Sequence, residues 1–149
     1  MKFKTIAHIA FKVSDMGASL RFYCDGLGFR KKFGLKDEKG RPWLIYLEIV
    51  PCQFLELYYD YDDSPKANRV GPKQIGYLHL SLEVENIQAV REELMQKGIT
   101  PDSEIKMQAD HTYQLWVTDP DGNRIEFMEY TSESLQIQEE IEENYVKEV

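Results

Sequence analysis

The sequence has few cysteines, no long apolar run and an excess of acidic over basic residues. Two cysteines in 149 residues are too few for a disulfide framework, so we expect Cys24 and Cys52 to be buried free thiols. No stretch approaches the roughly 18 apolar residues that a membrane-spanning helix needs. The N-terminus runs straight into alternating strand sequence without an apolar signal core, which predicts a cytoplasmic protein.

The charge balance narrows the class of partner. The chain carries 18 Lys and Arg residues against 26 Asp and Glu residues, a formal net charge of −8. Nucleic acids and anionic membranes select basic surfaces, so neither is expected as the main partner. Small molecules and other proteins remain as candidate partners.

Hydrophobic periodicity predicts one strand, one helix and three strands in the first half of the chain. Residues 6–13 alternate as a strand does, and a helix follows for which Asp15 is the N-cap and Gly28 the stop signal. The three strands after it are expected over 31–35, 43–50 and 53–59.

The second half repeats this order. A strand over 75–84 leads to a helix that Asn86 caps and Gly98 ends. Its three strands are expected over 99–106, 112–118 and 124–130. We therefore predict one α+β domain over 1–149, made of a module at about 1–60, a linker at about 61–73, a second module at about 74–131 and an acidic helical tail at 132–149.

A constant offset relates the two halves. His8 and His79 are 71 positions apart, as are the two helix caps, and the two helix-ending glycines are 70 apart. A fixed offset that links a strand histidine, a cap and a helix stop indicates an internal duplication. His111 lies outside this repeat, and we expect it in a loop.

The duplication also singles out four polar residues on strands. Residues 77–84 alternate strictly, so His79 faces away from the leucines, and His8 is its counterpart. Glu56 and Glu126 are each flanked by apolar residues that point the opposite way, and they are 70 positions apart. Each half thus has one His on its first strand and one Glu on its last.

Two imidazoles and two carboxylates form a ligand set suited to divalent Ni, Zn, Co, Mn or Fe. A carboxylate between apolar neighbours is costly to bury unless a cation, a hydrogen-bond network or water compensates its charge. The alternative is that all four side chains face solvent on one side of an open sheet, because two-sided alternation is normal in antiparallel sheets.

The chain resembles the vicinal oxygen chelate superfamily and, within it, glyoxalase I (lactoylglutathione lyase). The likeness covers about residues 5–130, and its most specific part is the run from Asp119 to Glu126. It also rests on the segments 5–9, 14–15, 21–23, 27–29, 54–57 and 77–80. The resemblance implies two βαβββ modules whose curved sheets form a cup around a metal, with ligands at His8, Glu56, His79 and Glu126.

The resemblance further implies a reaction. Its substrate would be the hemithioacetal of a 2-oxoaldehyde such as methylglyoxal, converted through a metal-stabilised enediolate to a 2-hydroxyacyl thioester. Glu126 would be the base, with Glu56 facing it across the metal. Ni or Zn is the expected metal, with Co, Mn or Fe as alternatives, and a homodimer is the expected assembly.

Cosubstrate binding is where the chain departs from the glutathione-dependent pattern. Such relatives commonly have an Arg and an Asn at two positions that Lys12 and Asp60 occupy in this chain. Lys12 lacks the planar guanidinium with which an arginine binds a carboxylate in two places, and Asp60 adds negative charge. The identity of the thiol cosubstrate is therefore left open. Lys106 is a third candidate contact for an anionic cosubstrate.

Other activities of the same fold stay open: a ring-cleaving dioxygenase, a thiol transferase, an epimerase, or a binding protein without catalysis. Dioxygenases of this family use two His and one Glu around iron. A fourth ligand at Glu56 argues against that reading.

Overall fold

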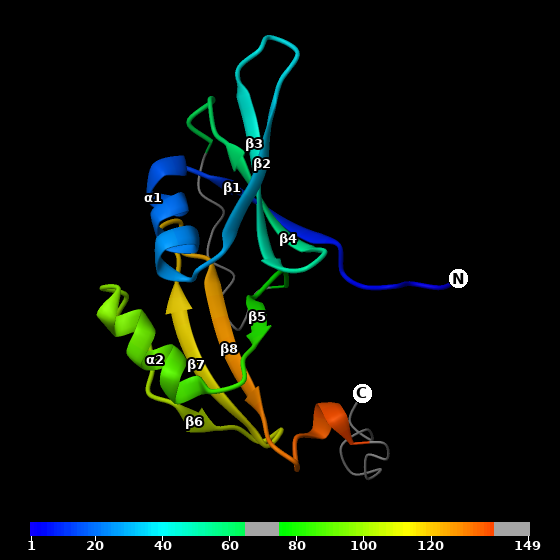
Figure 1. Ribbon diagram of the computed structural model, residues 1–149, viewed down its shortest axis with the longest axis vertical. Helices are drawn as coiled ribbons and strands as arrows, with labels where there is room; N and C mark the ends of the chain where they lie inside the picture. Colours follow the sequence, from blue (N-terminus) through cyan, green and yellow to red (C-terminus); the bar gives the residue numbers. More distant parts are fainter. Residues whose placement is uncertain (65–74, 139–149) are drawn as a thin grey trace. The chain divides into compact units, whose positions relative to one another are not determined.

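The computed structural model describes residues 1–64 and 75–138 (Figure 1). The chain divides into two compact units: Met1–Arg69 with Asp119–Gly122, and Val70–Thr118 with Asn123–Val149. Each unit is built on a four-stranded mixed sheet. In the described part of the chain, no helix has the length and apolar character needed to cross a membrane.

The first unit holds one complete βαβββ module. Its elements are β1 (His8–Val13), α1 (Met16–Leu20), the π-helix η1 (Arg21–Gly26), β2 (Arg30–Lys36), β3 (Pro42–Val50) and β4 (Gln53–Tyr59). The strand order is β1-β4-β3-β2, with β1 parallel to β4 and the other pairs antiparallel. Leu47, Leu55 and Leu57 are fully buried at its centre.

The second unit repeats the topology. Its elements are β5 (Leu80–Glu83), α2 (Ile87–Gln96), β6 (Lys106–Met107), β7 (Thr112–Thr118), β8 (Arg124–Tyr130) and the single 3-10 turn η2 (Leu135–Ile137). The order β5-β8-β7-β6 again places the first strand parallel to the last. Leu115, Val117 and Ile125 are fully buried. The predicted class, α+β with two tandem βαβββ modules, is confirmed.

Both predicted helix starts are confirmed by their caps. The Asp15 side chain accepts a hydrogen bond from the Ala18 amide, and Asn86 accepts one from the Ala89 amide. Each helix end is followed by a glycine in the left-handed region, Gly28 at φ +80° and Gly98 at φ +78°. A side chain with a Cβ is strained in that conformation, which explains glycine at both stops.

The first helix differs from the expected regular α-helix. After Leu20 it widens into the π-helix η1, in which the Leu27 amide donates to the Phe22 carbonyl. Tyr23 in this segment is fully buried, and its hydroxyl donates to Asp119 Oδ2 at 2.8 Å. Ser14 donates through its amide and hydroxyl to Asp121, so the acidic turn of residues 119–122 is fixed within the first unit.

Two predicted strands are much shorter than expected. The strand over 75–84 reduces to Leu80–Glu83, because Leu80 pairs with Ile125 and β8 begins only one residue earlier, so residues before 79 have no strand partner. The strand over 99–106 reduces to Lys106–Met107. Pro101 in this stretch has no amide hydrogen to donate to a neighbouring strand.

The thiol prediction was wrong for Cys52. This residue is exposed in the turn between β3 and β4, at φ +66°, whereas Cys24 is partly buried; both are free. The predicted acidic tail lies mostly outside the described residues, since 139–149 are not described. Residues 132–138 contain only the short turn η2.

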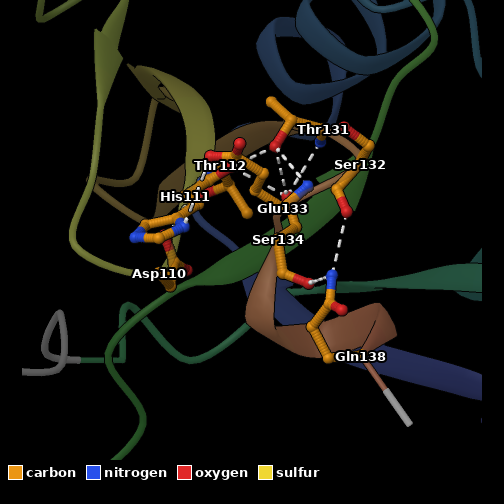
Figure 2. Close-up of polar contacts among 8 residues, drawn as sticks. All are labelled: Asp110, His111, Thr112, Thr131, Ser132, Glu133, Ser134 and Gln138. Carbon is orange, nitrogen blue, oxygen red and sulfur yellow. Dashed lines mark hydrogen bonds and ion pairs between the residues drawn. The ribbon is translucent and has the colours of Figure 1, made fainter. Parts of the chain in front are cut away.

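The segment after β8 is fixed to the loop before β7, as Figure 2 shows. The carbonyl of His111 accepts hydrogen bonds from Thr131 Oγ1 at 2.9 Å and from Ser134 Oγ at 2.8 Å. Ser134 is fully buried and also accepts a bond from the Thr131 amide. His111 is a loop residue, as predicted, and its Nδ1 lies 4.0 Å from Glu133 Oε2.

Candidate metal site

The first candidate pair is His8 and Glu56, which the parallel pairing of β1 with β4 brings together. Ala10 is the register partner of Glu56, so His8 lies two residues away on the neighbouring strand. His8 Nε2 is 3.7 Å from Glu56 Oε2. Glu56 is only 4% exposed, whereas the His8 side chain is half exposed, so the carboxylate is buried and the imidazole remains accessible.

The second pair, His79 and Glu126, has the same construction. Ser81 on β5 pairs with Glu126 on β8, and His79 stands one residue before the strand begins. His79 Nε2 is 3.4 Å from Glu126 Oε2, and Glu126 is 3% exposed. The predicted duplication therefore extends from sequence spacing to side-chain geometry.

Each pair has an aromatic neighbour at the equivalent place. Tyr46 pairs in register with Glu56, and its ring meets His8 edge to face at 6.1 Å between centroids. Trp116 pairs with Glu126 and meets His79 in the same way at 4.9 Å. These rings pack beside the imidazoles and limit the positions that the imidazoles adopt.

The pairs have the chemistry of metal ligands. Two ligand atoms at about 2.1 Å from one ion are roughly 3.4 Å apart at the tetrahedral angle, close to both nitrogen–oxygen separations. A buried carboxylate flanked by apolar residues needs a compensating charge, which a divalent ion supplies. The residues therefore fit a divalent metal. Within the described residues, no group of three or more His, Cys, Asp or Glu side chains gathers, so each unit offers two ligands.

Tyr58 adds a hydrogen-bond donor beside the first pair. Burial raises the pKa of the Tyr58 hydroxyl, and the Glu56 carboxylate raises it further by its charge and by accepting a hydrogen bond. Tyr58 thus lies close enough to Glu56 to feel its charge. Such contacts to a ligand carboxylate tune metal affinity in other sites.

Lys12 and Asp60, predicted to contact the cosubstrate, contact each other. Lys12 Nζ lies 2.8 Å from Asp60 Oδ1 and donates to Ser64 Oγ at 2.6 Å. The hydrogen bond from Lys12 holds the pKa of Asp60 well below its usual value of 3.8. The same contact raises the pKa of Lys12 above 10.5. The ammonium charge is therefore already compensated.

The third predicted contact, Lys106, is exposed on β6. The order β5-β8-β7-β6 places it on the edge strand, separated by β7 from the strand that carries Glu126. Lys106 is therefore not on a strand next to the one that carries Glu126.

Sequence reasoning missed Arg124. Its guanidinium carbon lies 4.1 Å from the centre of the Trp116 ring, next to the second pair. The equivalent residue 70 positions earlier is Phe54. Comparing the two halves at this offset, position by position, would have identified the replacement of a phenyl ring by a cation.

Comparisons with known proteins agree with this architecture. Residues 5–127 match the model of the Glyoxalase/Bleomycin resistance protein/Dioxygenase superfamily. A probable lactoylglutathione lyase of Synechocystis sp. is 29% identical over 133 residues, covering 85% of this chain and 96% of that protein.

Two solved structures are similar in fold to this chain. A glyoxalase family protein from Enterococcus faecalis is 27% identical with a TM-score of 0.71, covering 86% of this chain and 99% of that one. TnmS3, an antibiotic binding protein from Streptomyces sp. CB03234, shares the fold at 21% identity and a TM-score of 0.67, covering 88% and 99%. With its duplicated module and this match over most of its length, the chain belongs to the glyoxalase/bleomycin resistance protein/dioxygenase superfamily.

Proposed function

We propose that the protein is a metal-dependent lyase of glyoxalase type, which converts a 2-oxoaldehyde–thiol hemithioacetal to a 2-hydroxyacyl thioester. The observation that carries the proposal is the duplicated pair of a buried carboxylate and an accessible imidazole, at 3.7 Å and 3.4 Å. The likeness to a probable lactoylglutathione lyase supports the same reaction. One divalent ion, with Ni or Zn as the first candidates, is proposed to have four ligands: His8, Glu56, His79 and Glu126.

In this proposal Glu126 moves the carbon-bound proton of the hemithioacetal. Glu126 takes the proton from the carbon that carries the thiol sulfur and returns it to the neighbouring carbonyl carbon, while the hydroxyl proton of the hemithioacetal passes to the former carbonyl oxygen, so no oxidant or reductant is needed. When bound, the divalent ion supplies Lewis-acid stabilisation of the negative charge that develops on the two substrate oxygens. Ile125 and Phe127, both buried beside Glu126, keep the strand that carries it fixed. Glu56 serves as the opposing ligand.

The deciding experiment is to load the purified protein with Ni, Zn, Co, Mn or Fe and incubate it with methylglyoxal and a panel of thiols. We expect thioester formation with at least one metal and one thiol, and loss of it in Glu126→Gln. Glu92→Gln, on the exposed side of α2, is the matched control and should remain active. If no metal and thiol combination yields thioester, the proposed reaction is wrong.

The same preparations test the alternatives. Oxygen uptake on catechols by the iron-loaded protein would indicate a ring-cleaving dioxygenase. A protein that binds small molecules tightly but purifies without stoichiometric metal would instead be a binding protein. The near-equal geometry of the two pairs favours a ligand role for Glu56, and hence the lyase.

We further propose that the protein is a homodimer. Mixing inactive Glu56→Gln and Glu126→Gln variants separates two arrangements of the four ligands. If each site takes one pair from each chain, random exchange restores about one quarter of the wild-type sites, because half the dimers are mixed and each contains one intact site. If each site lies within one chain, no activity returns. The proposed compartment is the cytoplasm, where exposed Cys52 and a thiol cosubstrate both stay reduced.

A further inference from the structure

Arg124 occupies a fixed place beside the second pair. Its guanidinium lies over the face of Trp116, at 4.1 Å from the ring centre, and the His79 ring packs nearly perpendicular to the same indole with 4.9 Å between ring centres. A guanidinium over an indole face is held by the ring's negative quadrupole. Trp116 therefore positions the arginine next to the imidazole.

The strand register supports this placement. Arg124 and Glu126 are two residues apart on β8, so both side chains emerge on the same face of the sheet. Leu80 pairs with Ile125 in the parallel ladder, so continuing that register by one residue sets His79 opposite Arg124. The cation, the imidazole and the carboxylate thus belong to one face of one unit.

The donors of Arg124 are available. Stacking occupies the flat face of the guanidinium and leaves its five N–H groups at the edge. Arg124 pairs through its backbone with Thr118, but among the residues that the structure describes none forms a hydrogen bond or ion pair with its guanidinium. By contrast, Arg41 donates to Asp37 at 2.8 Å, and Arg30 is bound to Glu48. Arg124 is exposed, so a solute can reach these donors.

At the equivalent position the first unit has an aromatic residue instead of a cation. Phe54 stands where Arg124 stands in the second unit, with its ring 5.8 Å from that of Tyr46. The nearest basic residue along β1 is Lys12, which is bound to Asp60. In the described part of the chain, Arg124 is therefore the cation beside a candidate ligand pair whose charge no carboxylate compensates.

We propose that Arg124 binds a carboxylate carried by the substrate, and so selects thiols that bear an acid group. A planar carboxylate accepts two parallel hydrogen bonds from a guanidinium edge, a geometry that an amide cannot reproduce. The identification of this ligand as a substrate rests on the proposed lyase function. The binding itself does not require turnover.

Trp116 provides a direct readout of binding. Replacing Trp43 by Phe leaves Trp116 as the single tryptophan, because the chain has two. Mercaptoacetate and its neutral amide, mercaptoacetamide, are the paired probes, titrated against both metal-free and zinc-loaded protein while Trp116 fluorescence is recorded. Inorganic phosphate is a third probe that distinguishes a carboxylate site from a general anion site.

We expect mercaptoacetate to bind at least about tenfold more tightly than its amide, and Arg124→Gln to remove that difference. Arg124→Lys keeps the positive charge without the planar guanidinium, so its preference for the acid should lie between those of the parent and of Arg124→Gln. Arg91→Gln, which removes an arginine on α2, is the control and should bind as the parent does. Equal affinities of the parent for acid and amide, or an unchanged preference in Arg124→Gln, would overturn the proposal.

Kinetics separates this inference from the lyase proposal. With hemithioacetals of the same two thiols, Arg124→Gln should raise KM for the acid about tenfold and leave KM for the amide unchanged. A normal fluorescence response without any thioester product would contradict the lyase function alone. Thioester formation with a KM that depends neither on the acid group of the thiol nor on Arg124 would contradict the present inference alone.

Discussion

Lys12 Nζ, on the strand β1 that begins at His8, is 2.8 Å from Oδ1 of Asp60, which directly follows β4, the strand that carries Glu56. Ser64 completes the arrangement by donating from its amide and its hydroxyl to the Asp60 carboxylate. A cation held this closely by its own chain offers little to an incoming anion. The local effect of the pair is on the acid stability of the first unit.

Asp60→Asn should lower the melting temperature at pH 7, and this difference from wild type should shrink in acid. The pKa of Asp60 is lowered in the folded state, so its stabilising contribution is present above its ordinary value of 3.8 and is lost as the pH falls through the folded-state pKa. Thermal unfolding between pH 7 and pH 2 measures this. Asp62→Asn, an exposed neighbour, should show a smaller effect at every pH.

Glu56→Gln and Glu126→Gln should each weaken binding of divalent metal by about tenfold or more, since each removes a charged ligand atom. Calorimetric titration with Zn or Ni, and elemental analysis of protein purified without chelator, measure the loss. Glu92→Gln should keep the parent affinity. Full metal content in both variants would show that the ligand assignment is wrong.

The same two variants should be at least as stable as wild type when no metal is bound, with Glu126→Gln gaining about 1 kcal/mol in free energy of unfolding. The reason is that an amide is less costly to bury than a carboxylate. Adding metal at about 100 times its Kd should stabilise wild type by about 2.7 kcal/mol and the variants much less. Denaturant unfolding with and without chelator gives both values.

Tyr23→Phe should destabilise the protein by about 1 to 3 kcal/mol, because it leaves the buried Asp119 carboxylate without the hydrogen bond that the tyrosine donates. Tyr113→Phe removes a hydroxyl from an exposed tyrosine on β7 and should change stability by less than about 0.5 kcal/mol. Chemical unfolding of both variants measures the difference. Equal stability of the two would contradict a structural role for the Tyr23 contact.

Ser134→Ala should cost about 1 to 3 kcal/mol, since the buried hydroxyl both donates to the His111 carbonyl and accepts from the Thr131 amide (Figure 2). Hydrogen exchange should also accelerate at the Thr131 amide. Ser132→Ala changes an exposed serine two residues away in the same segment and is the control.

The parts of the fold that sequence predicted well are those whose pattern is local. Several features lie at the expected positions: the two caps, the two glycine stops and the strands β7 and β8. Each of them depends on neighbouring residues along the chain. The repeat then located His8, Glu56, His79 and Glu126. Their pairing distances come from parallel register, which no local pattern specifies.

The failures have non-local causes. The alternating residues 75–79 suit a strand, yet a strand also needs a partner, and β8 does not extend far enough to supply one. The contact of Lys12 with Asp60 joins residues 48 positions apart, so sequence could propose each as a cosubstrate contact without showing that they neutralise each other. Whether the four ligands bind one metal stays a prediction.

The parallel pairing of first and last strand has a consequence for the order of folding. The antiparallel strands β2, β3 and β4 are consecutive and form by closing short loops, but β1 joins β4 only after nearly fifty residues are brought together. His8 meets Glu56, and His79 meets Glu126, only at that last step. We therefore expect metal affinity to appear late during refolding, so that metal uptake reports when each module is complete.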